Sequence, residues 1–366
     1  MKTEHSVFFK NSADMDEISS ESIDLIVTSP PYPMIEMWDE IFISENTEIK
    51  KLIEEQNGFK AFKLMHQELN KIWGECSRVI KKGGIICINI GDATRKIGNI
   101  FRLYPNHVEI ANYFHENGYI VLPSILWRKP TNSPTKFMGS GMIPSNAYIT
   151  LEHEYILIFR KGKKKRKFQP KSQKRYNSAY FWEERNRWFS DIWSDIKGES
   201  QSLENYNNLR ERSAAFPIEL PYRLINMFSI YGDNILDPFW GTGTTSIAAM
   251  ISARNSYGYE KISDFSEVFN NNIKNIKEIT RTINLSRLTN HISFVKKYIK
   301  EKEIKYSSIK YKFPVVTTQE KNFLLYSIDN VQKSGNSYKI NHREYEYEYE
   351  YEVENRKKLI QSRLIP

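Results

Sequence analysis

The chain has 366 residues, with 53 lysines and arginines against 44 aspartates and glutamates, which gives a net charge of +9 and an isoelectric point of about 9.1. This basic balance favours a polyanionic partner, and the length suits one large domain with additions or two domains. The two cysteines, Cys76 and Cys87, have neither CxxC nor zinc-type histidine spacing, which argues against a structural metal. Because the chain has no apolar stretch of about 18 residues and no signal peptide, we expect a soluble protein of a reducing cytosol.

Strands and helices are expected to alternate along the first half of the chain. Residues 5–32 predict a strand, a short helix and a second strand, and residues 48–82 predict a helix that is closed by Lys81-Lys82-Gly83-Gly84. The further expected elements are a strand at 85–90, a helix at 107–117, and strands at 119–127 and 155–159. Such alternation is typical of an α/β fold with a mostly parallel, doubly wound sheet.

The second of these strands, at 23–27, runs into the tetrad Ser29-Pro30-Pro31-Tyr32. Pro31 has a fixed φ and no N–H, and it keeps Pro30 extended. The carbonyls near Ser29 and Pro30 are therefore free to accept hydrogen bonds from an exocyclic amino group, while Tyr32 offers a flat face for a base. Taken alone, the tetrad is equally consistent with a strand that ends in a proline turn.

A basic segment follows the strand at 155–159. Residues 160–167 carry seven positive charges in eight positions, and aromatic residues up to Trp193 are interleaved with further lysines and arginines. Basic residues neutralise phosphates, and aromatic residues can wedge, stack or form a small core. A solvated loop is the alternative for the charge run, and each tryptophan is better explained as a core residue than as a base contact.

Residues 234–250 read as a strand, a glycine loop and a helix. Gly241 and Gly243 let a ligand approach the backbone closely, and Asp237 ends the strand, where open α/β sheets bind ligands. The loop lacks the Gly-Lys-Ser/Thr of a P-loop and the GxGxxG of dinucleotide sites, so it suits a cationic ligand without phosphates. One strand later, Glu260 is placed to bind ribose hydroxyls. An ordinary tight turn is the alternative.

Together the two motifs resemble the amino-methylating DNA methyltransferases that use S-adenosyl-L-methionine, over roughly residues 5–275. The tetrad precedes the glycine loop, which is similar to the permuted order of the beta group. The resemblance implies a Rossmann-like, doubly wound methyltransferase sheet with circularly permuted motifs and an inserted target-recognition region. It also implies S-adenosyl-L-methionine as cofactor, double-stranded DNA as substrate, a prokaryotic cytoplasm, and host protection beside a cognate restriction endonuclease.

The same resemblance divides the chain into four parts. The catalytic half is expected at 1–160, the target-recognition region at 161–212, the cofactor-binding half at 213–284, and a C-terminal extension of unknown role at 285–366. Within the extension, residues 344–352 alternate Glu and Tyr, which is consistent with an edge strand or with a repeat that has no function. We favour the repeat.

Site residues follow from the resemblance as well. Ser29 would hydrogen-bond the amine or the ring edge, the Pro30 carbonyl would accept an amine hydrogen, and Tyr32 would stack on the extruded base. The residues grouped with the cofactor are Asp237, Pro238, Phe239, Gly241, Gly243, Thr244, Glu260, Phe216, Pro217, Asn89, Gly91 and Asp92, the last three matching a strand end that faces the substrate pocket. The expected DNA contacts are Lys163, Lys164, Lys165, Arg166, Lys167, Trp127 and Lys129, with a core position the equal alternative for Trp127.

The sequence departs from the family pattern at two places. The usual His-Pro before Phe216 is replaced by Arg212-Ser213, and the family's Gly-Asp, whose acid reaches the adenine of the cofactor, corresponds to Asn11-Ser12, with Asp14 a weak substitute. His153-Glu154 matches the His-Glu that precedes a family strand.

The first residue of the tetrad indicates the base. Ser-Pro-Pro-Tyr resembles enzymes that act on the cytosine 4-amino group, whereas Asp or Asn in the place of Ser29 is more usual for adenine, so we expect cytosine N4, with adenine N6 as the alternative. Carbon-5 methylation would need a Pro-Cys nucleophile, and neither Cys76 nor Cys87 follows a proline. A catalytically idle methyltransferase fold that only binds DNA is the second hypothesis; RNA is a weaker substrate hypothesis.

Overall fold

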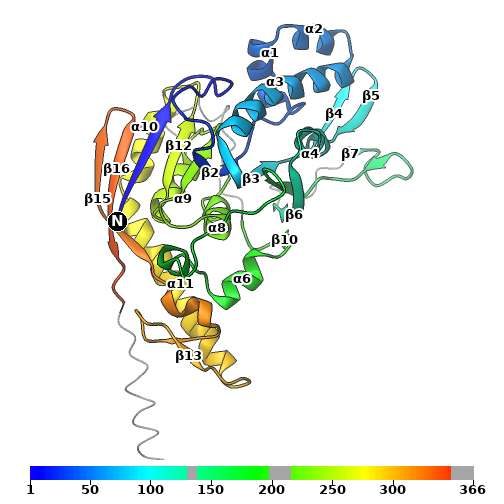
Figure 1. Ribbon diagram of the computed structural model, residues 1–366. Coiled ribbons are helices and arrows are strands. Elements are labelled where there is room, and N and C mark those ends of the chain that lie inside the picture. The colour runs from blue at the N-terminus through cyan, green and yellow to red at the C-terminus, as the bar shows by residue number, and fades with distance from the viewer. Residues whose placement is uncertain (130–137, 198–215, 348–366) are drawn as a thin grey trace, which may run out of the picture.

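The computed structural model describes residues 1–129, 138–197 and 216–347. Ten strands form one sheet in the order β10-β6-β9-β3-β2-β11-β12-β1-β16-β15 (Figure 1). In chain order they are β1 (Lys2–Phe8), β2 (Ile23–Thr28), β3 (Ile80–Ile90), β6 (Ile120–Arg128), β9 (His153–Arg160), β10 (Ile192–Trp193), β11 (Asn234–Asp237), β12 (Asn255–Tyr259), β15 (Tyr326–Ser334) and β16 (Ser337–Glu344).

The centre of the sheet is a parallel block. Neighbouring strands β3, β2, β11, β12 and β1 all run parallel, while β9 runs antiparallel between β3 and β6, and the β15–β16 hairpin is antiparallel at the other edge. All six residues of β2 are buried, as expected for a parallel strand that is covered on both faces. The prediction of a doubly wound α/β sheet is confirmed for this block.

Helices cover both faces of the sheet, and side chains alternate between them. Ile26 of β2 packs in the cluster under α3 (Gly58–Val79) and α4 (Asn106–Glu116), whereas Leu25 and Val27 pack in the opposite cluster. That second cluster lies under α8 (Glu219–Phe228), α9 (Thr244–Ile251), α10 (Phe265–Ile273) and the start of α11 (Ile276–Tyr298). Because alternate side chains of β2 point to opposite faces of the sheet, this one strand contributes to both hydrophobic clusters.

The remaining elements are short. The helices are η1 (Glu36–Trp38), α1 (Asp39–Glu45), α2 (Glu48–Glu54), α5 (Gln173–Asn177), α6 (Trp182–Trp188) and η2 (Thr318–Asn322). The small hairpins are β4 (Ala93–Ile97) with β5 (Ile100–Tyr104), β7 (Met138–Gly139) with β8 (Ala147–Tyr148), and β13 (Tyr306–Ser307) with β14 (Pro314–Val315). Within the described residues, no helix combines the length and the apolar character that crossing a membrane requires.

Three local predictions were wrong. Turns, not a short helix, connect β1 to β2. The expected helix at 48–82 is two helices, because the Asn57 side chain caps a new helix by accepting the Lys60 N–H at 3.4 Å. Lys81 and Lys82 do not close that helix but lie within β3, where pairing with β2 shifts register and Gly83 takes a φ of +81°.

The segments after residue 160 are joined to the sheet and to each other. β10 pairs with β6, β16 pairs with β1, and α11 runs across residue 284 without a break. A third small core joins Phe181, from the expected target-recognition region, to Leu288, Phe313 and their neighbours in the C-terminal extension. The four-part division therefore remains a hypothesis about function. The Glu-Tyr alternation begins at Glu344, which is the last residue of β16. Beyond Tyr347 the alternation falls outside the described residues.

Candidate active site

The two sequence motifs meet at one edge of the sheet. β2 and β11 are parallel neighbours, with Leu236 opposite Ile26, so their carboxyl ends lie side by side. There the Thr28 hydroxyl donates a hydrogen bond of 2.6 Å to Asp237 Oδ1. A cavity of about 980 Å³ opens at this edge, lined on one side by the tetrad Ser29-Pro30-Pro31-Tyr32 and on the other by residues of the glycine loop. This position agrees with the rule for ligand binding in open α/β sheets.

Glycine is required at two positions around the loop. Gly243 has a φ of +78° directly before α9, and a Cβ there would meet the rings of Phe269 and Trp240. Gly258 in β12 has an ordinary φ, but a Cβ would meet the Trp240 indole, which lies over this strand. The indole N–H donates to Ser246 Oγ at 2.9 Å, which anchors the loop to α9. Gly243 and Gly258 leave room for the indole, and the hydrogen bond to Ser246 holds it. Trp240 is therefore a fixed part of the cavity wall.

Two carboxylates line the loop side of the cavity. Asp237 is buried, and this burial raises its pKa to about 6, opposed by hydrogen bonds that include those from Thr28 and the Phe239 N–H. Glu260 accepts the Gly241 N–H at 2.9 Å and the Ile262 N–H at 3.0 Å, and burial raises its pKa as well. One buried and one partly buried acid, beside a loop that has no basic residue, suit a cation and ligand hydroxyls rather than phosphates.

Most of the residues predicted for the cofactor come together here. The cavity is lined by Asp237, Pro238, Phe239, Gly241, Thr244, Glu260 and Phe216. Pro217 lies behind it at the start of α8, and Gly243 lies behind it at the start of α9. Asn11 and Ser12 also line the cavity, whereas Asp14 pairs with Lys10 at 3.3 Å, so Asp14 does not replace the missing family acid.

One wall was not predicted from the sequence. Residues of η1 and α1, among them Trp38 and Phe42, line the cavity opposite the sheet. Glu45 at the end of α1 pairs with Lys261 and accepts the Asn11 side-chain N–H at 3.0 Å. These two contacts join the end of α1 to Asn11, which follows β1, and to Lys261, which follows β12. No motif marks this segment, and only its mixed apolar and acidic composition could have drawn attention to it.

On the tetrad side, Tyr32 is the centre of a hydrogen-bond network. Its hydroxyl donates to Glu154 Oε2 at 2.9 Å, accepts from Asn89 Nδ2 at 2.9 Å, and lies 3.1 Å from Ser29 Oγ. Burial and the charge of Glu154 raise the pKa of Tyr32 well above its ordinary value, so Tyr32 is a neutral phenol. Sequence reasoning noted the His153-Glu154 pair but missed this role of Glu154.

Asn89, Gly91 and Asp92 support the tetrad and do not line the large cavity. Asn89 donates to both Tyr32 and Glu154, and a Cβ on Gly91 would lie 2.9 Å from the Tyr32 ring. Asp92 accepts from the His107 ring at 2.8 Å and from its backbone N–H at 3.1 Å, at the start of α4. Asn89 and Gly91 contact Tyr32 of the tetrad and Asp92 contacts His107, and the grouping of these three residues with the cofactor stays a prediction.

Trp127 is a core residue. Its side chain is buried in the main hydrophobic cluster, and its indole N–H donates to the Ile196 carbonyl at 3.0 Å. The expectation that it contacts DNA is therefore corrected. Lys129, two residues later, remains half-exposed, and its ammonium lies 3.2 Å from Glu154 Oε1. Lys129 is thus placed beside the Tyr32 network, and its contact with DNA stays a prediction.

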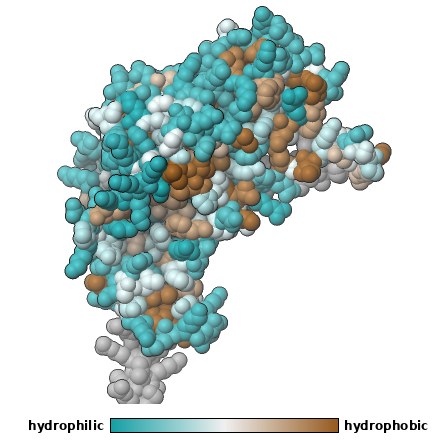
Figure 2. All heavy atoms as spheres, turned by 45° about the vertical axis from the view of Figure 1, so that its right-hand side comes forward, coloured by the Kyte–Doolittle hydropathy of each residue, from teal (hydrophilic) through white to brown (hydrophobic). Residues whose placement is uncertain are grey.

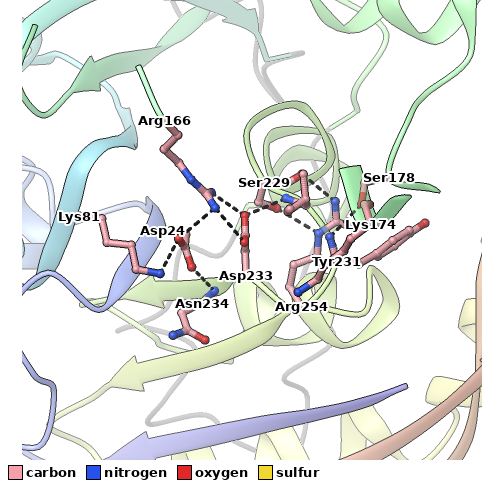
Figure 3. A network of polar contacts seen from close by, with 12 residues as sticks. Asp24, Lys81, Arg166, Lys174, Ser178, Ser229, Tyr231, Asp233, Asn234 and Arg254 are labelled. Carbon is pink, nitrogen blue, oxygen red and sulfur yellow. Dashed lines mark hydrogen bonds and ion pairs between the residues drawn. The ribbon is translucent and has the colours of Figure 1, made fainter. Parts of the chain in front are cut away.

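The basic run lies at the opposite edge of the sheet. Arg166 donates to Asp233 at 2.6 and 3.1 Å and lies 3.2 Å from Asp24, which also pairs with Lys81 (Figure 3). Asp24 and Asp233 stand at the amino ends of β2 and β11, whose carboxyl ends carry Ser29 and Asp237. The run is thereby about 15 Å of strand away from the cavity.

Arg166 therefore has a structural role, and its predicted DNA contact is corrected. Its guanidinium lies between two buried carboxylates and is the cation that they share, while Lys81 pairs with Asp24 alone. Lys163, Lys164, Lys165 and Lys167 are exposed beside it, and the structure does not bring them to the cavity. Residues 198–212, the rest of the predicted target-recognition region, lie outside the described residues.

Comparison with known proteins decides the family. The family described as "DNA methylase" matches residues 23–271, which include both motifs. The chain belongs to this family. It is 55% identical over 328 residues to the Type II methyltransferase M.MthZI of Methanothermobacter thermautotrophicus, covering 89% of this chain and 91% of that protein. It is 54% identical over 269 residues to the Type II methyltransferase M.MjaI of Methanocaldococcus jannaschii, covering 70% and 87%.

A solved structure supports the same conclusion. The crystal structure of a Thermus thermophilus protein described as a putative DNA modification methylase, in complex with S-adenosyl-L-methionine, superposes with a TM-score of 0.58 at 29% identity, covering 74% of this chain and 94% of that one. The present 366-residue chain is therefore an S-adenosyl-L-methionine-dependent DNA methyltransferase of the beta group, with the permuted motif order that the sequence predicted. The cavity fits the cofactor, because it offers two carboxylates, apolar walls and room for a drug-sized ligand.

Proposed function

We propose that this methylase transfers a methyl group to the exocyclic N4 amine of a flipped-out cytosine within a specific double-stranded DNA sequence. The observation that carries this proposal is Ser29, which lines the cavity at the end of β2 in the place where related adenine enzymes more often carry Asp or Asn. Adenine N6 is the alternative target, because the same cavity chemistry serves any exocyclic amine.

The tetrad addresses the main chemical difficulty of the reaction. An exocyclic amine is a poor nucleophile because its lone pair is delocalised into the ring. Hydrogen bonds accepted from its N–H groups favour a tetrahedral nitrogen and make the lone pair available. Ser29 Oγ and the Pro30 carbonyl are the acceptors that the tetrad offers, and both residues line the cavity. Their contribution is positioning and electrostatic stabilisation, with no covalent enzyme intermediate.

The cofactor has a separate place in the cavity. S-adenosyl-L-methionine, when bound, supplies an electrophilic methyl group on a positively charged sulfur. Asp237 and Glu260 are the carboxylates on that side, and we assign them to the positive charge of the ligand and to its ribose hydroxyls. Phe216, Phe239 and Pro238 add apolar surface against which the remainder of the ligand packs.

The target base must leave its duplex to reach the tetrad. The Tyr32 ring is held against Gly91, at a distance that leaves no room for a Cβ there. Its hydroxyl is fixed by Glu154 and Asn89, so the ring cannot swing freely. A fixed aromatic ring beside Ser29 is a suitable platform for stacking an extruded base.

The biological role that we infer is protection of host DNA. The two similar proteins described above, from Methanothermobacter thermautotrophicus and Methanocaldococcus jannaschii, are both named as type II methyltransferases, and they match most of this chain. We propose that this chain likewise modifies one recognition sequence in the cytoplasm and has a cognate restriction endonuclease as partner in the same system.

Nucleoside analysis tests the proposal. Purified protein is incubated with duplex DNA and S-adenosyl-L-methionine that carries a labelled methyl group, and the DNA is then digested and separated. We expect the label on N4-methylcytosine, and none with Ser29→Ala. Label on N6-methyladenine alone would replace the proposed base, and cofactor binding without any transfer would indicate an idle fold.

A further inference from the structure

The hydrogens around Tyr32 can be assigned by counting. The phenol has one hydrogen, and its oxygen has three neighbours, Glu154 Oε2, Asn89 Nδ2 and Ser29 Oγ. A carboxylate can only accept, so the phenol hydrogen goes to Glu154. The Asn89 amide donates, as its N–H groups also do to Glu154 at 2.7 Å.

The hydroxyl hydrogen of Ser29 therefore has only one possible direction. The Tyr32 oxygen has already given its only hydrogen to Glu154, so in the 3.1 Å contact the Ser29 hydroxyl must be the donor. Its oxygen then presents only lone pairs to the cavity that it lines. This is the polarity that an amine N–H of the substrate requires. The carboxylate of Glu154, two hydrogen bonds away, therefore makes Ser29 an acceptor.

We propose that Glu154 is the final proton acceptor of the methyl transfer, reached from the target amine through Ser29 and Tyr32. This inference rests on the function proposed above. As the amine lone pair forms the new N–C bond, the C–S bond of the donor breaks and its electron pair stays on sulfur, which becomes neutral. The methylated nitrogen then carries a positive charge and must lose one proton to give the neutral product. That proton passes to Ser29 Oγ, the Ser29 hydrogen passes to the Tyr32 oxygen, and the Tyr32 hydrogen passes to Glu154 Oε2.

The surroundings of Glu154 agree with this role. Its side chain is 14% exposed, and its second oxygen, Oε1, lies 3.2 Å from the half-exposed Lys129 ammonium. The first oxygen is held by Tyr32 and Asn89. One oxygen thus faces the hydrogen-bond chain inside the site, and the other faces the half-exposed Lys129 ammonium. An Asp at the head of the tetrad would supply a carboxylate directly, whereas Ser29 needs one behind it.

The test compares two glutamates that lie two residues apart. Glu154→Gln keeps the size of the side chain and can still accept from Tyr32, but it has no carboxylate to take a proton. Glu152→Gln is the matched control, because Glu152 is exposed and pairs with Arg128 at 3.1 Å, outside the network. For each variant we would measure the single-turnover rate of methyl transfer to duplex DNA, its solvent deuterium isotope effect, and the affinities for S-adenosyl-L-methionine and DNA.

We expect Glu154→Gln to slow methyl transfer about 100-fold or more, the lower end for loss of a general base, with both affinities within about two-fold of the parent. The isotope effect of the parent protein should disappear in Glu154→Gln, Glu154→Asp should restore part of the rate, and Glu152→Gln should behave as the parent. A Glu154→Gln rate close to the parent, or a parent without an isotope effect, would overturn the proton route. A parent that methylates no DNA would overturn the proposed function, and the route with it.

A different observation concerns the protein surface beside the site. The β4–β5 and β7–β8 hairpins lie together, with the rings of Phe101 and Tyr148 stacked 4.3 Å apart. Between β7 and β8, Met142 is 85% exposed and Ile143 is 70% exposed, and Ile149 just beyond β8 is 86% exposed. Figure 1 shows the β7 hairpin projecting from the body of the molecule, and Figure 2 shows hydrophobic atoms on this projection. Such exposed apolar side chains usually mark a binding surface.

Charge and position indicate which partner this surface fits. Residues 93–104 and 138–149 contain Lys96 and Arg102 and no acidic residue; a third cation, Arg95, is already paired with Asp39 at 2.7 Å. The β7–β8 hairpin lies between the end of β6 at Arg128 and the start of β9 at His153, next to Lys129 and Glu154. It therefore lies at the edge of the sheet that carries the tetrad. An apolar tip with basic neighbours at this place fits duplex DNA, into which methionine and isoleucine side chains can wedge.

We further propose that Met142 and Ile143 form a wedge that enters the base stack when the target base is extruded. The test is the double variant Met142→Ser with Ile143→Ser, compared with Ile309→Ser, whose side chain is 56% exposed in the C-terminal region. We would measure affinity for a matched duplex, affinity for a duplex with a mismatch at the target base, and the oligomeric state.

We expect the double variant to bind the matched duplex about ten-fold more weakly, and to lose less on the mismatched duplex, because a mismatched base is extruded more easily. Ile309→Ser should bind both as the parent does. Unchanged affinity for the matched duplex would overturn the wedge. A change from dimer to monomer in the double variant would assign the surface to a second copy of this chain instead.

Discussion

The Thr28 hydroxyl donates a 2.6 Å hydrogen bond to the carboxylate of Asp237, although 209 residues separate them in the chain. Thr28 ends the strand that leads into the catalytic tetrad, and Asp237 ends the strand that leads into the glycine loop. This contact joins the two halves of the site at the carboxyl ends of β2 and β11. It also opposes the effect of burial, which raises the pKa of Asp237 to about 6.

Cofactor binding should therefore depend on pH and on Thr28. Asp237 is charged above about pH 6 and neutral below it, so affinity for the cationic cofactor should fall as the pH decreases from 7.5 to 5.5. Thr28→Val removes the hydrogen bond that lowers this pKa, so the fall should begin at higher pH, and affinity at pH 7 should drop about two-fold, because losing about 1.4 kcal/mol leaves about half of the carboxylate charged at that pH. Titration calorimetry across this range measures both effects. Thr28→Ser is the control, and equal pH profiles for all three proteins would contradict the assignment.

The close fit of Trp240 against β12 gives a second prediction. Gly258→Ala places a Cβ against the indole and should displace the loop, weakening cofactor affinity by about ten-fold or more and lowering stability by about 1–3 kcal/mol, the usual cost of overpacking. Gly74→Ala is the matched control, because the nearest atom to its Cβ is 3.9 Å away. Calorimetry and urea unfolding give the two quantities. Parent-like binding by Gly258→Ala would show that Trp240 moves without consequence.

Arg166 should affect stability and not DNA binding. Arg166→Met leaves Asp24 and Asp233 without their shared guanidinium, so the free energy of unfolding should fall by about 1–3 kcal/mol. Affinity for DNA, and its dependence on salt, should stay close to the parent, because the guanidinium is already paired at the edge of the sheet away from the cavity. Urea unfolding and binding titrations at several salt concentrations measure these quantities. A lower salt dependence for Arg166→Met than for the parent would restore the original prediction of a phosphate contact.

Two buried histidines should make the protein sensitive to acid. Burial lowers the pKa of His5 to about 3 and that of His342 to about 4, and Thr3 hydrogen-bonds both rings. Between about pH 6.5 and 4 the unfolded chain takes up protons that the native state does not, so these residues reduce stability as the pH falls. His342→Gln should lose about 2 kcal/mol less than the parent between pH 7 and pH 5. Urea unfolding at the two pH values tests this, and equal losses would contradict it.

The parts of the site that were predicted correctly depend on local chemistry. Pro31 restricts its neighbours whatever surrounds them, and Gly241 and Gly243 mark a tight loop after a short apolar strand, so both motifs can be read from a few adjacent residues. The alternation of strands and helices then places both motifs at the carboxyl edge of the sheet.

The parts that were missed depend on contacts between distant residues. Glu154 reaches Tyr32 only because β9 pairs antiparallel with β3 beside the tetrad. In the sequence, Arg166 is one of several charges in a basic run. Its structural role depends on Asp24 and Asp233, which are far away in the chain and pair with its guanidinium. Lys81 and Lys82 resemble the end of a helix, but pairing with β2 makes them part of a strand.

The base that receives the methyl group is identified directly by nucleoside mass spectrometry of DNA methylated by this protein. We expect N4-methylcytosine at a single recognition sequence, with none in DNA treated with Ser29→Ala. N6-methyladenine as the only modified nucleoside would contradict this expectation.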